Sequence, residues 1–208
     1  MNDQLRKGLR VGLYLVLGVV ALPVLLILGL IIWYTVDRAT GEDFPTVRPA
    51  DRARQATDRS QEMYDAAGID RPLPAVRSGE NTAADNRITG DLCYPRGIEG
   101  IADTPEPGSY RLYHKWRLDA VDKAAGTAAL GKLHAHLEAT GWTITDYGPS
   151  DDDWELRAHK GDIDDRVSFT WRSHWQRLDG FIGMPCAYDP AGAKGEAAVE
   201  DLEPPALH

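Results

Sequence analysis

The sequence lacks the short motifs that mark the best-known catalytic centres. It contains no G-x-S-x-G, S-x-x-K or H-E-x-x-H pattern and no glycine loop of the phosphate-binding kind. Nothing else in it indicates a bound cofactor. We therefore identify no catalytic residue from the sequence, and an enzyme is an alternative rather than the leading interpretation.

Cysteine is rare, with only Cys93 and Cys186 in 208 residues. Neither has a Cys or His partner at metal-ligand spacing, so no metal site is predicted. No cysteine stands near the N-terminus, which argues against a lipoprotein anchor. In an extracytoplasmic domain, two such distant cysteines are expected to form one disulfide. Two unrelated buried thiols are the alternative.

Lysine is scarce, whereas arginine, alanine, aspartate and glycine are favoured, as in proteins from GC-rich bacterial genomes. The formal net charge is −9. Nucleic acid attracts basic proteins, so this balance argues against nucleic acid as a general partner.

The longest uncharged stretch includes Val11 to Tyr34. At about 1.5 Å per residue, a helix of this length crosses a hydrocarbon core of about 30 Å. A secretory signal peptide is the alternative, but its apolar region has only about 7–15 residues and ends at a small-residue cleavage site. Residues 33–38 offer no such site. We predict an uncleaved, single-pass signal-anchor helix over residues 11–36.

The charges beside this stretch predict its orientation. Arg6, Lys7 and Arg10 crowd its N-terminal side, whereas base is more dilute beyond it. Positively charged flanks favour the cytoplasm. The expected location is therefore the cell membrane, with a cytoplasmic N-terminus and an extracytoplasmic C-terminal domain.

Glycine and proline divide the remainder of the chain. We predict a linker and a polar juxtamembrane helix over 37–68, an irregular loop region over 69–109, a folded domain over 110–189 and a disordered tail over 190–208. The helix within the second segment opens at Pro49 and ends before Gly68. Its side chains are mostly polar, which predicts a helix that is solvated or that lies along the surface of the domain or membrane. Of these we favour a solvated, stalk-like juxtamembrane helix.

The folded domain is predicted to be α+β. Residues 110–118 alternate, with Leu112, His114, Trp116 and Leu118 facing inward. A helix over 128–140 follows, with Thr127 as N-cap and a Gly141–Trp142 ending of the Schellman type. Four further strands then fall at about 142–147, 154–159, 166–172 and 178–188. The order is β-α-β-β-β-β, with the helix on one face of an antiparallel sheet.

Histidines and acid runs are weak candidates for chemistry. His134 and His136 are separated by about 200° on a helix, so they are not expected to share a metal ion. His114 faces inward beside Trp116 and is expected to be structural. The acid runs at 151–153 and 162–165 lack EF-hand spacing and are interpreted as solvated turns rather than calcium sites.

One sheet face combines positive side chains. If the alternation holds, seven residues point away from the helix: Arg111, Lys115, Arg117, Arg157, His159, Arg166 and Arg172. Within the strands only Glu155 opposes them. Such a face could meet anionic lipid, an anionic envelope polymer or an acidic envelope protein. The alternative is a solvated face, neutralised by the acidic turns and the 51–67 helix.

Three functions follow from these features. The first is a membrane-anchored extracytoplasmic interaction or structural domain of the bacterial envelope. The second is an anchored hydrolase-like enzyme that uses His114 or His134 with a turn aspartate. The third is a small-ligand or lipid sensor, with a pocket between the helix and the 69–108 loop.

Overall fold

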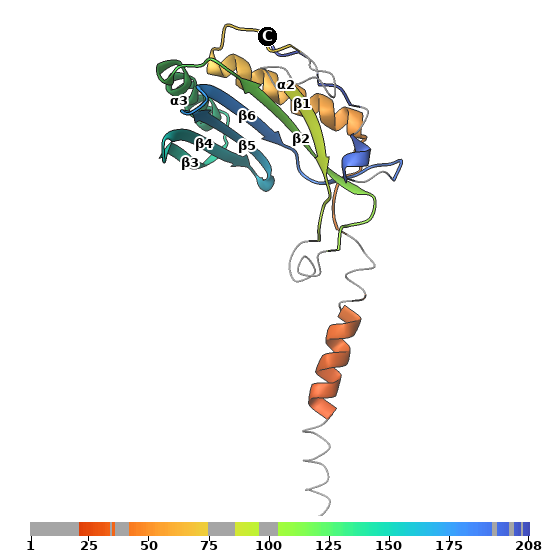
Figure 1. The fold of residues 1–208 in the computed structure, drawn as a ribbon. Helices are drawn as coiled ribbons and strands as arrows, with labels where there is room; N and C mark the ends of the chain where they lie inside the picture. The colour runs from red at the N-terminus through yellow and green to blue at the C-terminus, as the bar shows by residue number, and fades with distance from the viewer. Residues whose placement is uncertain are drawn as a thin grey trace, which may run out of the picture. The chain divides into compact units, whose positions relative to one another are not determined.

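The computed structural model describes residues 21–33, 35, 42–74, 86–95, 104–192, 195–199, 202–204 and 206–208. The chain divides into two compact units, Met1–Glu42 and Asp43–His208. Figure 1 shows the second unit as a sheet with helices behind it.

In the first unit, residues 21–33 and 35 are helical. Their large apolar side chains are exposed, from 48% at Leu28 to 66% at Leu22 and Leu25. No helix within the described residues is both long and apolar enough to cross a membrane. Residues 11–20, 34 and 36 of the predicted anchor lie outside the described part of the chain, so the anchor stays a prediction.

The second unit is α+β, as predicted. Its described strands form one antiparallel sheet in the order β1-β2-β6-β5-β4-β3, with β7 paired to β2. The strands are β1 (Asn86–Asp91), β2 (Ser109–Leu118), β3 (Thr143–Ser150), β4 (Asp153–Lys160), β5 (Asp162–Arg172), β6 (Arg177–Gly183) and β7 (Ala187–Tyr188). Two α-helices, α2 (Pro49–Ala67) and α3 (Lys123–Ala139), pack against one face of this sheet.

Strand β2 follows the predicted alternation. Leu112, His114, Trp116 and Leu118 are buried beneath the helices, with at most 4% of each exposed. Successive strand residues point to opposite faces, so the residues between them lie on the open face of the sheet. From β2 to β6 the order of the elements agrees with the prediction, but the strand predicted over 178–188 is divided into β6 and β7.

The ends of α3 differ in how well they were predicted. The Schellman ending is confirmed: Gly141 has φ +80°, and the Trp142 amide donates to the Leu137 carbonyl at 2.9 Å. The predicted N-cap, Thr127, is wrong. Asp122 caps the helix by accepting from the Ala125 amide at 2.8 Å, because the helix begins at Lys123, five residues before the predicted start at 128.

The 49–67 helix is not a solvated stalk. It has the predicted ends, Pro49 and Gly68, but Met63 and Tyr64 are fully buried. Its buried stripe also contains Ala53, Ala56, Ser60 and Ala67. Small side chains at helical spacing let the backbone approach the sheet closely, which a search for large apolar residues overlooks.

The compact unit is also larger than the predicted 110–189 domain. Strand β1 lies within the segment expected to be an irregular loop. The segment expected to be disordered contains the 3₁₀ helix η2 (Gly195–Ala198), and Leu207 is fully buried and pairs with Leu73. Their amides donate to each other's carbonyl oxygens at 2.8 and 2.9 Å, which fixes this tail to the fold.

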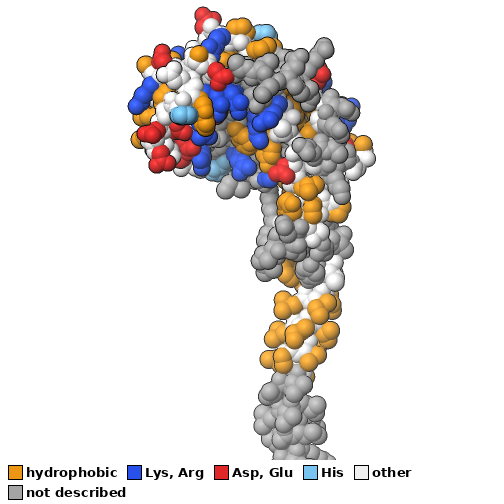
Figure 2. Space-filling model, in the orientation of Figure 1, with side chains coloured by type: hydrophobic (Ala, Val, Ile, Leu, Met, Phe, Trp, Pro, Cys, Tyr) orange, Lys and Arg blue, Asp and Glu red, His pale blue; other side chains and the backbone are white. Residues whose placement is uncertain are grey.

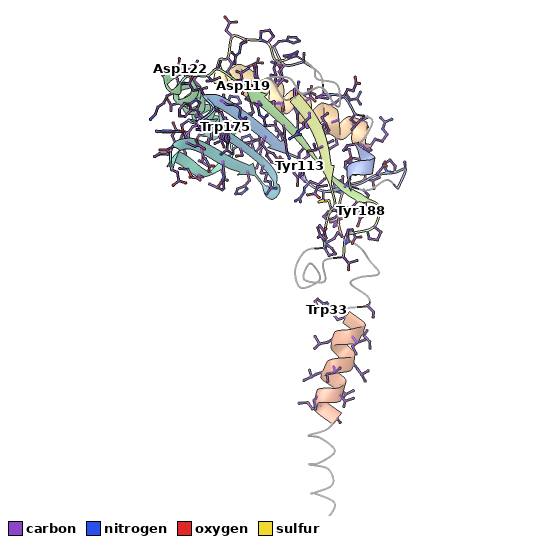
Figure 3. The ribbon with its side chains drawn as sticks, viewed as in Figure 1. Trp33, Tyr113, Asp119, Asp122, Trp175 and Tyr188 are labelled. Atoms are coloured by element: carbon purple, nitrogen blue, oxygen red, sulfur yellow. A yellow bond between two sulfur atoms is a disulfide. The ribbon has the colours of Figure 1, made fainter. Side chains whose placement is uncertain are left out.

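The two cysteines lie at disulfide distance, as predicted (Figure 3). Cys93 follows β1 and Cys186 precedes β7; the sulfurs are 2.04 Å apart and the Cα atoms 6.0 Å apart. The bond therefore ties the β1–β2 connection to the end of the sheet that β7 joins.

Candidate anion-binding face

The strand register places the positive side chains on the open face. Residues directly opposite each other on antiparallel strands share a face. One row crosses five strands: Arg87, Lys115, Phe181, Ser168 and Arg157. A second row contains Tyr113, Gly183, Arg166 and His159. All seven residues proposed from the sequence project from this face, and Figure 2 shows the Lys and Arg side chains gathered over it.

A groove of about 290 Å³ lies within this face. It crosses β1, β2, β6 and β5. Four cationic side chains, one carboxylate and two hydroxyl side chains line the groove: Arg87, Lys115, Arg117, Arg172, Asp179, Ser168 and Thr170. Phe181 also lines it. Three of the seven predicted residues therefore line the groove, and the other four surround it on the open face.

Asp179 of β6 organises the cations at one end of the groove. Its carboxylate meets Arg177 at 2.9 Å, Arg172 at 3.1 Å and Arg117 at 3.6 Å. Arg172 also meets Asp153 at 3.1 Å. Burial opposes the Arg172 charge, but hydrogen bonds and attraction from both carboxylates outweigh it and raise the Arg172 pKa. This part of the face is a connected ion-pair network.

An aromatic pair orders the cations beside this network. The rings of Tyr113 and Phe181 lie 5.0 Å apart. Lys115 and Arg166 lie 5.8 and 5.6 Å from the Phe181 centroid, within cation–π range. Neither forms an ion pair with a carboxylate among the described side chains. Their charges are thus positioned by a ring and are not neutralised by those carboxylates.

Gly183 leaves room for the Phe181 and Arg166 side chains. A Cβ at this position would come within 3.0 Å of the Phe181 ring and 3.1 Å of the Arg166 side chain. Gly183 lies between Tyr113 and Arg166 on the neighbouring strands and has no side chain above the sheet. The Phe181 ring packs over this position.

The face carries more acid than the sequence suggested. Besides Glu155, which meets Arg157 at 2.8 Å, Asp91, Asp153 and Asp179 also reach its arginines. Asp91 was missed because β1 was not predicted, and Asp153 because it was assigned to a turn although it begins β4. The α2 helix lies on the opposite side of the sheet, so its charges do not neutralise this face.

Sequence reasoning also missed Arg87 and Arg177. Both lie where an irregular connection was expected, but they belong to β1 and β6. The alternation of Arg177, Asp179 and Phe181 could have placed the last two on the open face, because Leu178 and Ile182 between and beside them are apolar.

His114 lies on the other side of the sheet, in a fully buried polar cluster. Its Nδ1 is 2.6 Å from the Ser60 hydroxyl, and its Nε2 is 2.7 Å from Asn86 Oδ1. All three residues have no exposed surface. A neutral ring that accepts from Ser60 and donates to Asn86 satisfies both contacts. The cluster joins α2, β1 and β2, and no carboxylate hydrogen-bonds His114 within the described part of the chain.

Burial lowers the His114 pKa to about 4, from an ordinary 6.5. The unfolded chain binds a proton here near pH 6.5, whereas the folded chain resists it until about pH 4. The stabilisation is complete above pH 6.5 and is lost as the pH falls toward 4. We expect His114 to contribute about 1.4 kcal/mol per pH unit to the slope of unfolding free energy across this window.

Denaturant titrations of the full chain between pH 7 and pH 4.5 measure this slope. His114→Gln should flatten it, and His174→Gln, which replaces an exposed histidine between β5 and β6, is the control. Equal slopes for wild type and His114→Gln would contradict the assignment.

The other candidate residues do not converge on the groove. His134 stacks on Tyr147 with ring centroids 4.2 Å apart, and His136 meets Glu62 of α2 at 2.9 Å. Asp151 and Asp152 are exposed in the β3–β4 turn. None of these four residues lines the groove.

The comparisons with known proteins do not add to this picture. No family model, curated protein or solved structure matches the chain.

Proposed function

We propose that this protein is a membrane-anchored, extracytoplasmic interaction domain that binds an anionic partner through the open face of its sheet. The observation that carries the proposal is the groove, whose lining residues include four cations and one carboxylate. Charge of one sign in a concave surface concentrates ligands of the opposite sign. The partner class is therefore an anionic polymer, lipid or envelope protein.

The chain's overall negative charge does not oppose this role. Ion pairs on the face consume only part of its positive charge, and Lys115 and Arg166 remain unpaired with carboxylates of the described residues. Figure 2 shows Lys and Arg side chains gathered over this face, with acidic side chains on several sides of them. A ligand responds chiefly to charges within about 10 Å, the screening length at 0.1 M salt.

Two features support the anchor and the compartment. The helical residues 21–33 expose large apolar side chains, which water does not favour and a bilayer accommodates. The Cys93–Cys186 pair fits an oxidising compartment, where disulfides persist. Both features agree with the positive N-terminal flank of the apolar stretch.

Charge reversal on the open face tests the proposal. We expect Lys115→Glu with Arg166→Glu to weaken binding of dextran sulfate, a model polyanion, by at least about tenfold at 0.1 M salt. These two positions are chosen because their reversal breaks no described ion pair. The full chain in a neutral detergent is suitable, with binding followed by calorimetry.

The matched control is Lys123→Glu with Lys132→Glu, which changes the net charge equally on α3. This variant should retain most of the binding. If both double variants lost binding equally, the effect would reflect net charge alone and the open face would not be the site.

A further inference from the structure

We propose that the groove is a built site for a phosphate group, in which Asp179 positions the arginines that receive it. This inference rests on the proposed function and narrows its ligand class. It makes Asp179, an acid within an anion site, a requirement for binding.

The geometry around Asp179 supports this role. Arg117, Arg172 and Arg177 reach one carboxylate from β2, β5 and β6, at 2.9 to 3.6 Å. Without that carboxylate, three guanidinium groups on neighbouring strands would repel one another and spread toward solvent. The carboxylate holds them together, and cations still outnumber carboxylates by four to one among the groove residues.

The donors match a phosphate group better than a carboxylate. A phosphate monoester carries about −1.5 to −2 charges and three acceptor oxygens, and arginine binds it with paired N–H groups. Arg117, Lys115 and the remaining guanidinium nitrogen of Arg172 supply charged donors, since Nε and Nη1 of Arg172 already donate to Asp179 and Asp153. Ser168 and Thr170 add hydroxyl groups to the same groove. A carboxylate offers one charge and two oxygens, and would leave more of these donors unused.

The aromatic pair argues against a stacked base as the main ligand. Tyr113 is only 7% exposed, and Arg111 and Lys115 lie 5.4 and 5.5 Å from its ring centroid. Lys115 and Arg166 flank Phe181 in the same way. Tyr113 therefore does not form the open stacking surface that single-stranded nucleic acids use, and the Phe181 ring supports two cations.

The test uses inorganic phosphate as the probe and the full chain in neutral detergent. Asp179→Asn removes one negative charge from the face, so a general electrostatic surface would bind phosphate more tightly. The built site predicts the opposite, a loss of about tenfold. Glu155→Gln removes an acid from the same face outside the groove and should not weaken binding.

The outcomes separate this inference from the proposed function. Unchanged or tighter phosphate binding by Asp179→Asn overturns the positioning role, even if Lys115→Glu with Arg166→Glu weakens dextran sulfate binding as expected. Acetate binding as tight as phosphate binding overturns the choice of phosphate.

Two further probes identify the carrier of the phosphate group. Vesicles containing phosphatidic acid present it on a lipid, and poly(glycerol phosphate) presents it on a soluble polymer. If one of these probes binds the wild type and binds Asp179→Asn more weakly, the site is supported and the carrier of the phosphate group is identified. If neither probe binds, the assignment of a macromolecular phosphate ligand is overturned.

Discussion

Replacing Trp116 by alanine is expected to lower the unfolding free energy by about 3–5 kcal/mol, among the largest effects of any single substitution in this domain. Trp116 is 2% exposed and lies between the helix layer and the sheet. Its ring packs edge-on against Tyr64 of α2, with centroids 5.2 Å apart, and lies 6.1 Å from Phe169 of β5. Its loss removes contacts from three elements at once.

Gly180 offers a sharper form of this test. It is the cross-strand partner of Trp116, and a Cβ at this position would overlap the indole ring. Gly180→Val should therefore destabilise the wild-type protein by about 1–3 kcal/mol through overpacking. In the Trp116→Ala background, the same valine enters the vacated space and should cost much less or restore stability.

Chemical denaturation of the four proteins in this cycle measures the coupling between the two sites. Trp175→Ala is the control, because Trp175 is 55% exposed beyond the end of β5 and should change stability little. Additive effects of the two substitutions would show that the Trp116 ring does not occupy the space above Gly180.

Removing the disulfide is the second substitution with a large expected effect. Cys93→Ala with Cys186→Ala should lower the unfolding free energy by about 2–5 kcal/mol, because the bond joins residues 93 positions apart and restricts the unfolded chain. It also ties the β1–β2 connection to the segment before β7. Urea denaturation of the oxidised protein and the double variant measures the difference.

Reductant supplies the control for this pair. Wild type treated with a reducing agent should match the double variant, and the double variant should not respond to the reagent. Equal stability of oxidised wild type and double variant would show that the bond does not constrain the fold.

The sequence predicted the elements whose pattern uses large side chains. Strand β2 alternates Leu112, Trp116 and Leu118 with charged residues, and α3 ends at a glycine followed by a tryptophan. In both cases the residues that the local backbone geometry favours are also the residues that the buried core requires. These are the parts of the fold in which a local pattern carries enough information.

The parts that were missed depend on long-range contacts. Besides Met63 and Tyr64, helix α2 is buried mainly through alanine and serine, which have no strong hydrophobic signature. Strand β1 is short, contains Gly90 and is stabilised by pairing with β2. The tail is fixed by the pairing of Leu207 with Leu73, more than a hundred residues earlier. None of these contacts can be read from a local pattern.

The candidate site shows the same division. Alternation along β2, β4 and β5 placed seven residues on one face without knowledge of the strand order. The groove itself depends on β6 lying between β2 and β5, which brings Asp179 to three arginines. That order follows from the whole chain, so the sequence predicted a basic face but not the network within it.

The central claim is that the open face of the sheet is the binding surface. The most direct test is to find which backbone amides respond to a bound polyanion. Amide chemical shifts of the isotope-labelled full chain, titrated with dextran sulfate, would be followed by nuclear magnetic resonance. We expect the largest changes in β2, β5 and β6, around Lys115, Arg166 and Phe181. Changes concentrated in α2 and α3, with the open face unaffected, would contradict the account.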